Sequence, residues 1–117
     1  MTGEVKKSVL QYMETPNLNY LKDIAAGDVA FEKNILNLLK DEFPKDYALF
    51  NENFNKKKYQ EAAQNVHKIK LKISMLGLTE GLEIASHFEK DLKVNDIKLF
   101  QEFINVLKKV LVYLKEK

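Results

Sequence analysis

The chain carries a helical repeat of apolar positions over most of its length. Between residues 59 and 76, apolar residues recur at spacings of three and four, as on a helix packed along one side. The apolar stripe of this segment comprises Ala62, Val66, Ile69, Ile73 and Leu76. No alternating run bounded by turn signals competes with this period. The pattern therefore predicts an all-α fold.

A longer apolar stripe precedes this helix and crosses a proline. It comprises Phe31, Ile35, Leu38, Leu39, Phe43, Tyr47, Phe50 and Phe54. Proline inside a helix removes a backbone donor, so either one bent helix or two abutting helices fits this register. The stripe stays in phase across Pro44, which favours the bent helix. Residues 51–58, which end in three lysines, are expected to turn the chain in solvent.

Turn and capping residues divide the start of the chain. Residues 1–17 are predicted to form an N-terminal tail or a short helix that ends at the turn around Pro16. A short helix is predicted over residues 18–26, with Leu21, Ile24 and Ala25 on one side. Gly27 ends it and Asp28 is placed to cap the next helix. The bundle domain is therefore predicted to span residues 18–117.

Two further helices are expected after Gly77. Thr79 is expected to cap the first, whose apolar stripe is Leu82, Ala85, Phe88 and Leu92. Asn95 or Asp96 is expected to cap the second, whose stripe is Ile97, Phe100, Ile104, Leu107, Leu111 and Leu114. Four long amphipathic helices with short connections bury their stripes best as an antiparallel up-down four-helix bundle. The predicted fold is this bundle with a short additional N-terminal helix.

Composition narrows the functional class. A chain of 117 residues forms one domain with a single core, and 45% apolar with 31% charged residues is typical of a globular protein. The net charge of +2, with lysines and acids interspersed, argues against nucleic-acid binding. The absence of cysteine excludes a disulfide framework and thiol catalysis.

Targeting signals are not visible in the sequence. The first ten residues lack the apolar segment of a secretory leader. No run approaches the ~20 apolar residues that a membrane-spanning helix needs. We therefore expect a cytoplasmic protein that does not bind membranes. A monomer is expected because no long apolar surface remains outside the four stripes, although the heptad spacing of the last helix also permits a dimer.

His67 lies one position away from the apolar stripe of its helix. A histidine at this position is expected at the edge of the core, partly exposed on a rigid backbone. Lys70 lies three residues further along and therefore over the same face. A neutral imidazole with a cation nearby is what a phosphoryl acceptor needs. Gln64 and Ser74 lie on this face as well and can hydrogen-bond the imidazole or a phosphate.

This segment resembles a known signalling module. His67 and Lys70 form an H-x-x-K motif with Gly77 ten residues after the histidine, in a helix that also carries Ala62, Ala63 and Ser74. Together with the helix order over residues 18–115, the motif resembles the histidine-containing phosphotransfer (HPt) domain of multistep two-component phosphorelays. The resemblance implies that His67 accepts a phosphoryl group from a receiver-domain aspartate and passes it to another, with Lys70 stabilising the phosphate.

The resemblance also implies cofactors and partners. HPt domains are phosphocarriers without kinase activity, and no G-x-x-x-x-G-K-[ST] phosphate loop occurs in this chain. The expected partners are response-regulator receiver domains, which supply the Mg²⁺, and a hybrid sensor histidine kinase is a further candidate. The chain is either a free-standing shuttle or a domain of such a kinase.

Leu71 departs from the family pattern, which usually has glycine directly after the lysine. At four residues from His67, its side chain either narrows the approach to the imidazole or offers the docking receiver an apolar contact. This departure supports an alternative hypothesis: a degenerate HPt fold that acts as a helical adaptor, binding receivers or other signalling proteins without phosphotransfer.

Other chemistries have less support in the sequence. His87 has no lysine three residues on and is interpreted as structural or solvent-facing. The two histidines and the scattered acids show no metal-ligand spacing, so no metal site is predicted. The apolar stripes contain no polar residue in phase, which argues against an enzyme with a pocket inside the bundle.

Overall fold

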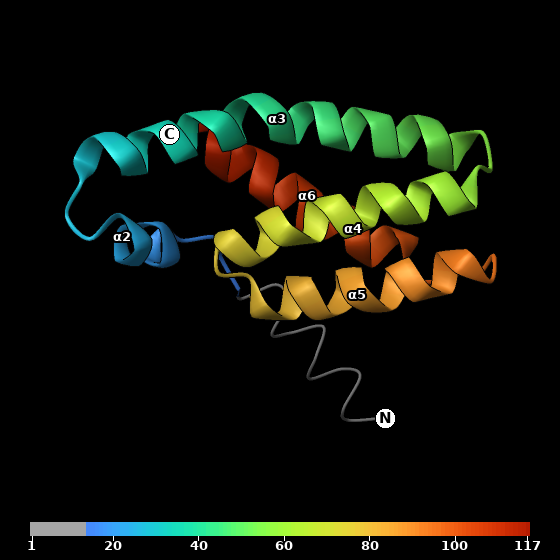
Figure 1. Ribbon diagram of the computed structural model, residues 1–117. Helices are drawn as coiled ribbons and strands as arrows, with labels where there is room; N and C mark the ends of the chain where they lie inside the picture. Colours follow the sequence, from blue (N-terminus) through green and yellow to red (C-terminus); the bar gives the residue numbers. More distant parts are fainter. Residues whose placement is uncertain (1–13) are drawn as a thin grey trace.

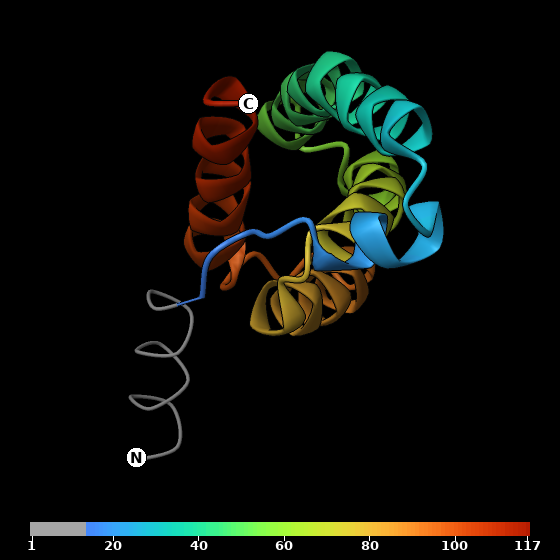
Figure 2. The same ribbon diagram turned by 90° about the vertical axis from the view of Figure 1, so that its left-hand side faces the viewer.

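The computed structural model describes residues 14–117 as five helices (Figure 1). They are α2 (Asn19–Ala25), α3 (Val29–Asn55), α4 (Tyr59–Met75), α5 (Thr79–Lys93) and α6 (Phe100–Lys115). The long helices α3 to α6 run alternately in opposite directions. Figure 2 looks roughly along α3, α4 and α5 and shows α6 from its side, inclined to them, with α2 beside α3 and α4. The all-α bundle with a short additional helix is therefore confirmed. Most of the predicted N-terminal tail or helix lies outside the described residues.

The core is built from the predicted stripes. All five residues of the α4 stripe are fully buried, and they pack around the rings of Phe43, Phe50, Phe88 and Phe103. The Phe50 ring lies edge-on to Phe103 with their centroids 5.1 Å apart. Each fully buried side chain of this size stabilises the fold by about 1.5–3 kcal/mol. Because this packing fixes the rotation of α4, residues beside the stripe are held at defined positions on the surface.

Helix α3 runs through Pro44 without interruption, as the in-phase stripe predicted. The turn predicted to begin at Asn51 is wrong, because α3 continues to Asn55. The last turn is stabilised by contacts with other helices: Asn53 Nδ2 donates to Asn65 Oδ1 at 2.7 Å, and Phe54 stacks on Phe100 at 4.0 Å between centroids. The chain then turns at residues 56–58, whose three lysines are exposed as expected.

Not every predicted stripe residue is buried, and three charged residues are. Leu38 and Ile97 are exposed, whereas Asp46, Lys72 and Glu89 are buried. The expectation that the buried faces contain only apolar residues is therefore wrong. These charges are tolerated because they are paired with one another or with their neighbours.

Lys72 links the two halves of α3. Its Nζ donates to Glu42 Oε1 at 2.8 Å and to Asp46 Oδ2, and these carboxylates lie on either side of Pro44, where the helix lacks a backbone donor. Burial lowers the pKa of Lys72, but the hydrogen bonds to Asp46 and Glu42 outweigh burial and raise this pKa above its ordinary value. Lys72 therefore stays charged and holds α3 against α4.

Of the three N-terminal caps predicted for the long helices, one is confirmed and two are wrong. Asp28 Oδ1 accepts from Phe31 N at 3.0 Å, which confirms the predicted cap of α3. The N-cap residue of α5 is Leu78, not Thr79, and it makes no side-chain cap hydrogen bond. Neither Asn95 nor Asp96 caps the last helix, because α6 begins only at Phe100. Asp96 instead accepts from Lys98 N at 3.0 Å in the preceding turn.

A distant residue caps α5 in place of Thr79. Glu14 accepts from Glu80 N and Gly81 N at 2.9 and 3.0 Å, which places a negative charge at the positive end of this helix. Lys109 Nζ donates to the Glu14 carbonyl oxygen at 2.6 Å. The cap of α5 therefore comes from the N-terminal segment, residues 14–17, which also contacts α6.

The rest of this segment also lies against the bundle. Pro16 is buried, and Asn17 N donates to Leu76 O at 2.9 Å. In Figure 2 the segment crosses from the side of α6 to α2. The domain boundary at residue 18 stays a prediction. No helix within residues 14–117 is long and apolar enough to cross a membrane.

Candidate functional site

His67 lies on the outer side of α4 with its side chain 62% exposed. Val66 and Ile69, which flank it in the sequence, belong to the buried stripe and fix the position of its backbone. The prediction of a partly exposed histidine at the edge of the core is therefore confirmed. The imidazole is accessible to a reactant from outside the protein.

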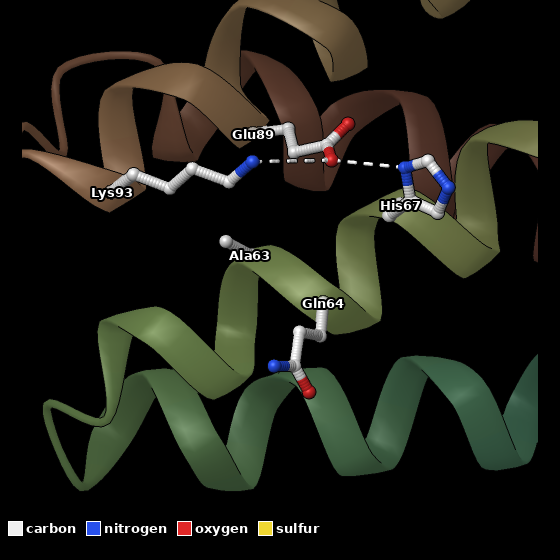
Figure 3. A pocket seen from close by; sticks show the side chains of 5 residues that line it. All are labelled: Ala63, Gln64, His67, Glu89 and Lys93. Carbon is white, nitrogen blue, oxygen red and sulfur yellow. Dashed lines mark hydrogen bonds and ion pairs between the residues drawn. The ribbon is translucent and has the colours of Figure 1, made fainter.

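Glu89 of α5 orients the imidazole. Its Oε2 lies 2.9 Å from His67 Nδ1, and Figure 3 shows the second ring nitrogen on the far side of the ring from this contact. An ionised carboxylate has only acceptor atoms, so the neutral imidazole facing it carries its proton on Nδ1. This arrangement leaves the lone pair of Nε2 unprotonated and directed away from Glu89.

Lys70 binds the other oxygen of the same carboxylate. Its Nζ lies 2.8 Å from Glu89 Oε1, and its side chain is only 23% exposed. The expected proximity of Lys70 and His67 is thus mediated by Glu89, which both side chains contact. The result is a connected row of imidazole, carboxylate and ammonium between α4 and α5.

The environment of Glu89 keeps it ionised. Its side chain is 11% exposed, and burial by itself raises the pKa of this carboxyl group. Hydrogen bonds from Lys70 and His67 outweigh burial, so the pKa of Glu89 lies below its ordinary value. Glu89 is therefore a carboxylate at neutral pH.

A shallow hollow of about 310 Å³ adjoins the imidazole (Figure 3). It is lined by Ala63, Gln64, His67, Glu89 and Lys93. Lys93 Nζ lies 3.9 Å from Glu89 Oε2, and its side chain is 57% exposed. In Figure 3 the amide of Gln64 points away from the line that joins Glu89 to His67. Gln64 therefore borders the hollow without facing the imidazole.

The remaining candidate residues lie outside the lining of this hollow. Leu71 is 60% exposed, and Ser74 is also exposed on α4. His87 is exposed on α5, in agreement with a solvent-facing role.

Within residues 14–117, no group of three or more histidine, aspartate or glutamate side chains is placed to hold a metal ion.

The sequence interpretation missed Glu89 and Lys93. Glu89 lies four residues after Ala85 and three before Leu92, both of which are buried, so it is an acid in phase with an apolar stripe. Such an acid needs a buried cationic or donor partner. The sequence therefore indicates that Glu89 needs a partner, but it does not show that the partners are His67 and Lys70 of α4.

The site presents an exposed imidazole whose Nδ1 faces a buried carboxylate, with a cation bound to the same carboxylate. A search of curated proteins and a search of solved structures found no match to this chain. A comparison with protein families did find one. Residues 34–117, which include every residue of the site, match the family profile described as Hpt domain.

Proposed function

The chain belongs to the Hpt domain family, and on this premise we propose that His67 is its phosphoacceptor. Hpt domains are phosphocarriers in two-component signalling and work with response-regulator receiver domains. In the proposed reaction, His67 accepts a phosphoryl group from the aspartate of one receiver and passes it to the aspartate of another. The observation that carries this proposal is the contact of Glu89 with His67 Nδ1, which leaves Nε2 of an exposed imidazole directed away from the carboxylate and available as a nucleophile.

The proposed transfer uses the lone pair of Nε2. This nitrogen attacks the phosphorus of the receiver's aspartyl phosphate in line, the N–P bond forms, and the bond from phosphorus to the aspartate oxygen breaks. The electron pair of the broken bond stays on the aspartate carboxylate. The ring then carries a positive charge, and Nδ1 still donates its proton to Glu89. Glu89 thereby stabilises the imidazolium that forms, and the reverse sequence delivers the phosphoryl group to a second receiver.

Lys70 is proposed to stabilise the phosphate. Its ammonium lies within one hydrogen bond of Glu89, so it offsets the negative charge of the carboxylate that the incoming phosphoryl group meets. The Mg²⁺ of the reaction is proposed to be bound by the receiver, whose carboxylates suit that ion. This chain is proposed to contribute no ATP site and no kinase activity.

Gln64, Leu71 and Ser74 are proposed to line the receiver-docking face. All three are exposed on α4, the helix that presents His67. Leu71 lies outside the lining of the hollow and is 60% exposed, which supports an apolar contact with the receiver over obstruction of the imidazole. A monomeric, cytoplasmic protein remains the expectation.

A helical adaptor without phosphotransfer is the second candidate function. The observation that favours it is Leu71 at the position where the family usually has glycine. In this case the docking face binds receivers or other signalling proteins, and His67 is a surface residue that stays unmodified.

Phosphotransfer can be tested with a receiver domain carrying a radiolabelled aspartyl phosphate. We expect base-stable, acid-labile label on the wild-type chain and none on His67→Ala. His87→Ala is the matched control, because it removes the other histidine, also exposed, and should leave labelling unchanged. Absence of label on the wild-type chain would contradict the proposal and favour the adaptor. Equal label on His67→Ala would contradict it by showing that another residue accepts the phosphoryl group.

A further inference from the structure

The hollow beside His67 is bordered by a cation that the proposed mechanism does not use. We infer that Lys93 is a specificity-determining residue that binds a carboxylate side chain of the docked receiver. This inference rests on the proposed function, since it assigns a partner contact to the same site.

Lys93 is the most weakly held of the three groups around Glu89. Lys70 occupies Oε1 at 2.8 Å and His67 occupies Oε2 at 2.9 Å, whereas Lys93 Nζ lies 3.9 Å from Oε2. That distance exceeds a hydrogen bond. Because both carboxylate oxygens already have closer donors, Lys93 can exchange this ion pair for another at small cost.

The backbone that carries Lys93 is better fixed than its ammonium. Gln60 Nε2, from the first turn of α4, donates to the Lys93 carbonyl oxygen at 3.1 Å and ties the end of α5 to α4. The side chain itself is 57% exposed. The ammonium of Lys93 is thus accessible while its backbone is held in place. This arrangement is expected of a contact residue at the rim of an interface.

The hollow has room for a side chain from a partner. Its volume is about 310 Å³, and Ala63, with its small side chain, lies between Gln64 and the ammonium of Lys93 (Figure 3). His67 and Glu89 border the opposite side. A residue that enters here therefore comes from the same protein that approaches the imidazole.

The chemistry of a receiver supplies a suitable occupant. Its reactive group is an aspartate, and the Mg²⁺ expected beside that aspartate is bound in proteins by one or two carboxylates together with waters and phosphate oxygens. The face that meets His67 therefore carries acidic groups. A lysine at the edge of the site attracts such a face, raises the association rate and discriminates against receivers without an acid at the matching position.

The test is the dependence of the initial transfer rate on receiver concentration, with Lys93→Ala and Lys93→Glu compared to the wild-type chain. We expect Lys93→Ala to raise the half-saturating receiver concentration by about three- to tenfold and leave the saturating rate unchanged. Lys93→Glu should raise this concentration further, and the difference from wild type should shrink at high salt because the contact is exposed.

Lys90 provides the matched control. It is an exposed lysine on the same helix, one turn before Lys93, and it does not line the hollow. Lys90→Ala and Lys90→Glu should leave the half-saturating concentration unchanged. Equal effects at both positions would show a response to net charge and overturn the inference. A fall in the saturating rate for Lys93→Ala, with unchanged half-saturation, would overturn it too, because Lys93 would then act on the chemistry through Glu89.

Binding measured without phosphotransfer separates this inference from the proposed function. Calorimetric titration with the unphosphorylated receiver should show weaker binding for Lys93→Ala and unchanged binding for Lys90→Ala. This result would stand even if His67 accepted no phosphoryl group. Equal affinity of the Lys93→Ala and wild-type chains would overturn the inference while leaving phosphotransfer by His67 intact.

Discussion

Glu89 Oε2 lies 2.9 Å from His67 Nδ1, although the two residues are 22 positions apart and belong to different helices. This contact assigns different tasks to the two imidazole nitrogens. Nδ1 is held by Glu89, and Nε2 points away from this carboxylate. The contact also draws Lys70 into the site, because that ammonium binds the second carboxylate oxygen at 2.8 Å.

Removing the Glu89 carboxylate should allow the His67 imidazole to change its tautomer and its orientation. We expect Glu89→Ala to lower the rate of phosphoryl transfer to His67 by about tenfold, by analogy with the carboxylates that orient metal-binding histidines, whose loss has effects of this size. Glu89→Gln should be affected less, because the amide oxygen can still accept from Nδ1. The nitrogen chemical shifts of the His67 ring report the tautomer directly. Unchanged shifts in Glu89→Ala would contradict the orienting role of Glu89.

The free energy of unfolding should depend on pH in the acid range because of the ion pairs of Glu89. Its pKa is lower in the folded protein than its ordinary value of 4.5, so its contribution is fully present above about pH 4.5. The contribution is lost as the pH falls through the folded-state pKa, because the protonated group no longer pairs with Lys70 and His67. Urea unfolding should therefore show a stability difference between wild type and Glu89→Gln at pH 6 that shrinks below about pH 4.5. A difference that does not vary with pH would contradict this assignment.

Leu71 should contribute to docking without blocking the imidazole. Its side chain is 60% exposed, so Leu71→Ala should leave stability nearly unchanged. If the receiver buries this side chain, the substitution should raise the half-saturating receiver concentration by about tenfold. The transfer assay described for Lys93 measures the half-saturating concentration and the saturating rate, and urea unfolding measures the stability. Faster transfer at saturating receiver would show instead that Leu71 obstructs the site.

The buried lysine between α3 and α4 should be important for stability. Lys72→Met leaves Asp46, whose side chain is 10% exposed, without its closest cation, and we expect a loss of about 3 kcal/mol in unfolding free energy. Lys45→Met is the control, because Lys45 forms an exposed ion pair with Asp41 and should contribute less than about 1 kcal/mol. Hydrogen exchange should also accelerate around Pro44 in Lys72→Met. Equal destabilisation by the two substitutions would contradict the proposed role of Lys72.

The contact between the N-terminal segment and Gly77 can be tested against a second glycine. Gly77 has φ +77°, and a Cβ atom there would lie 2.5 Å from Asn17 Nδ2. Gly27 has φ +89°, but a Cβ atom there would have no neighbour within 4 Å. Both alanine substitutions incur backbone strain of about 1 kcal/mol, so Gly77→Ala should destabilise the protein more than Gly27→Ala in denaturant unfolding. Equal losses would show that the Asn17 side chain moves away from the new Cβ atom at little cost.

Local spacing along the chain was sufficient to predict much of this protein. The period of the α4 stripe placed its five apolar residues in the core and His67 beside them, because side-chain direction in a helix follows directly from residue number. The same regularity favoured a helix that continues through Pro44, and the structure confirms it. The H-x-x-K motif could be read for a similar reason: His67 and Lys70 are neighbours on one helix, whatever packs against it.

The tertiary structure alone decided which groups from different helices meet. Glu89 joins His67 across 22 positions, Asp46 joins Lys72 across 26, and Glu14 caps α5 across 66. These pairings depend on how the helices are rotated and shifted against one another, which the packing of the whole core determines and no local period encodes. The sequence by itself therefore determined the helices and the position of the histidine, and the packing of those helices decided which nitrogen of the histidine contacts Glu89.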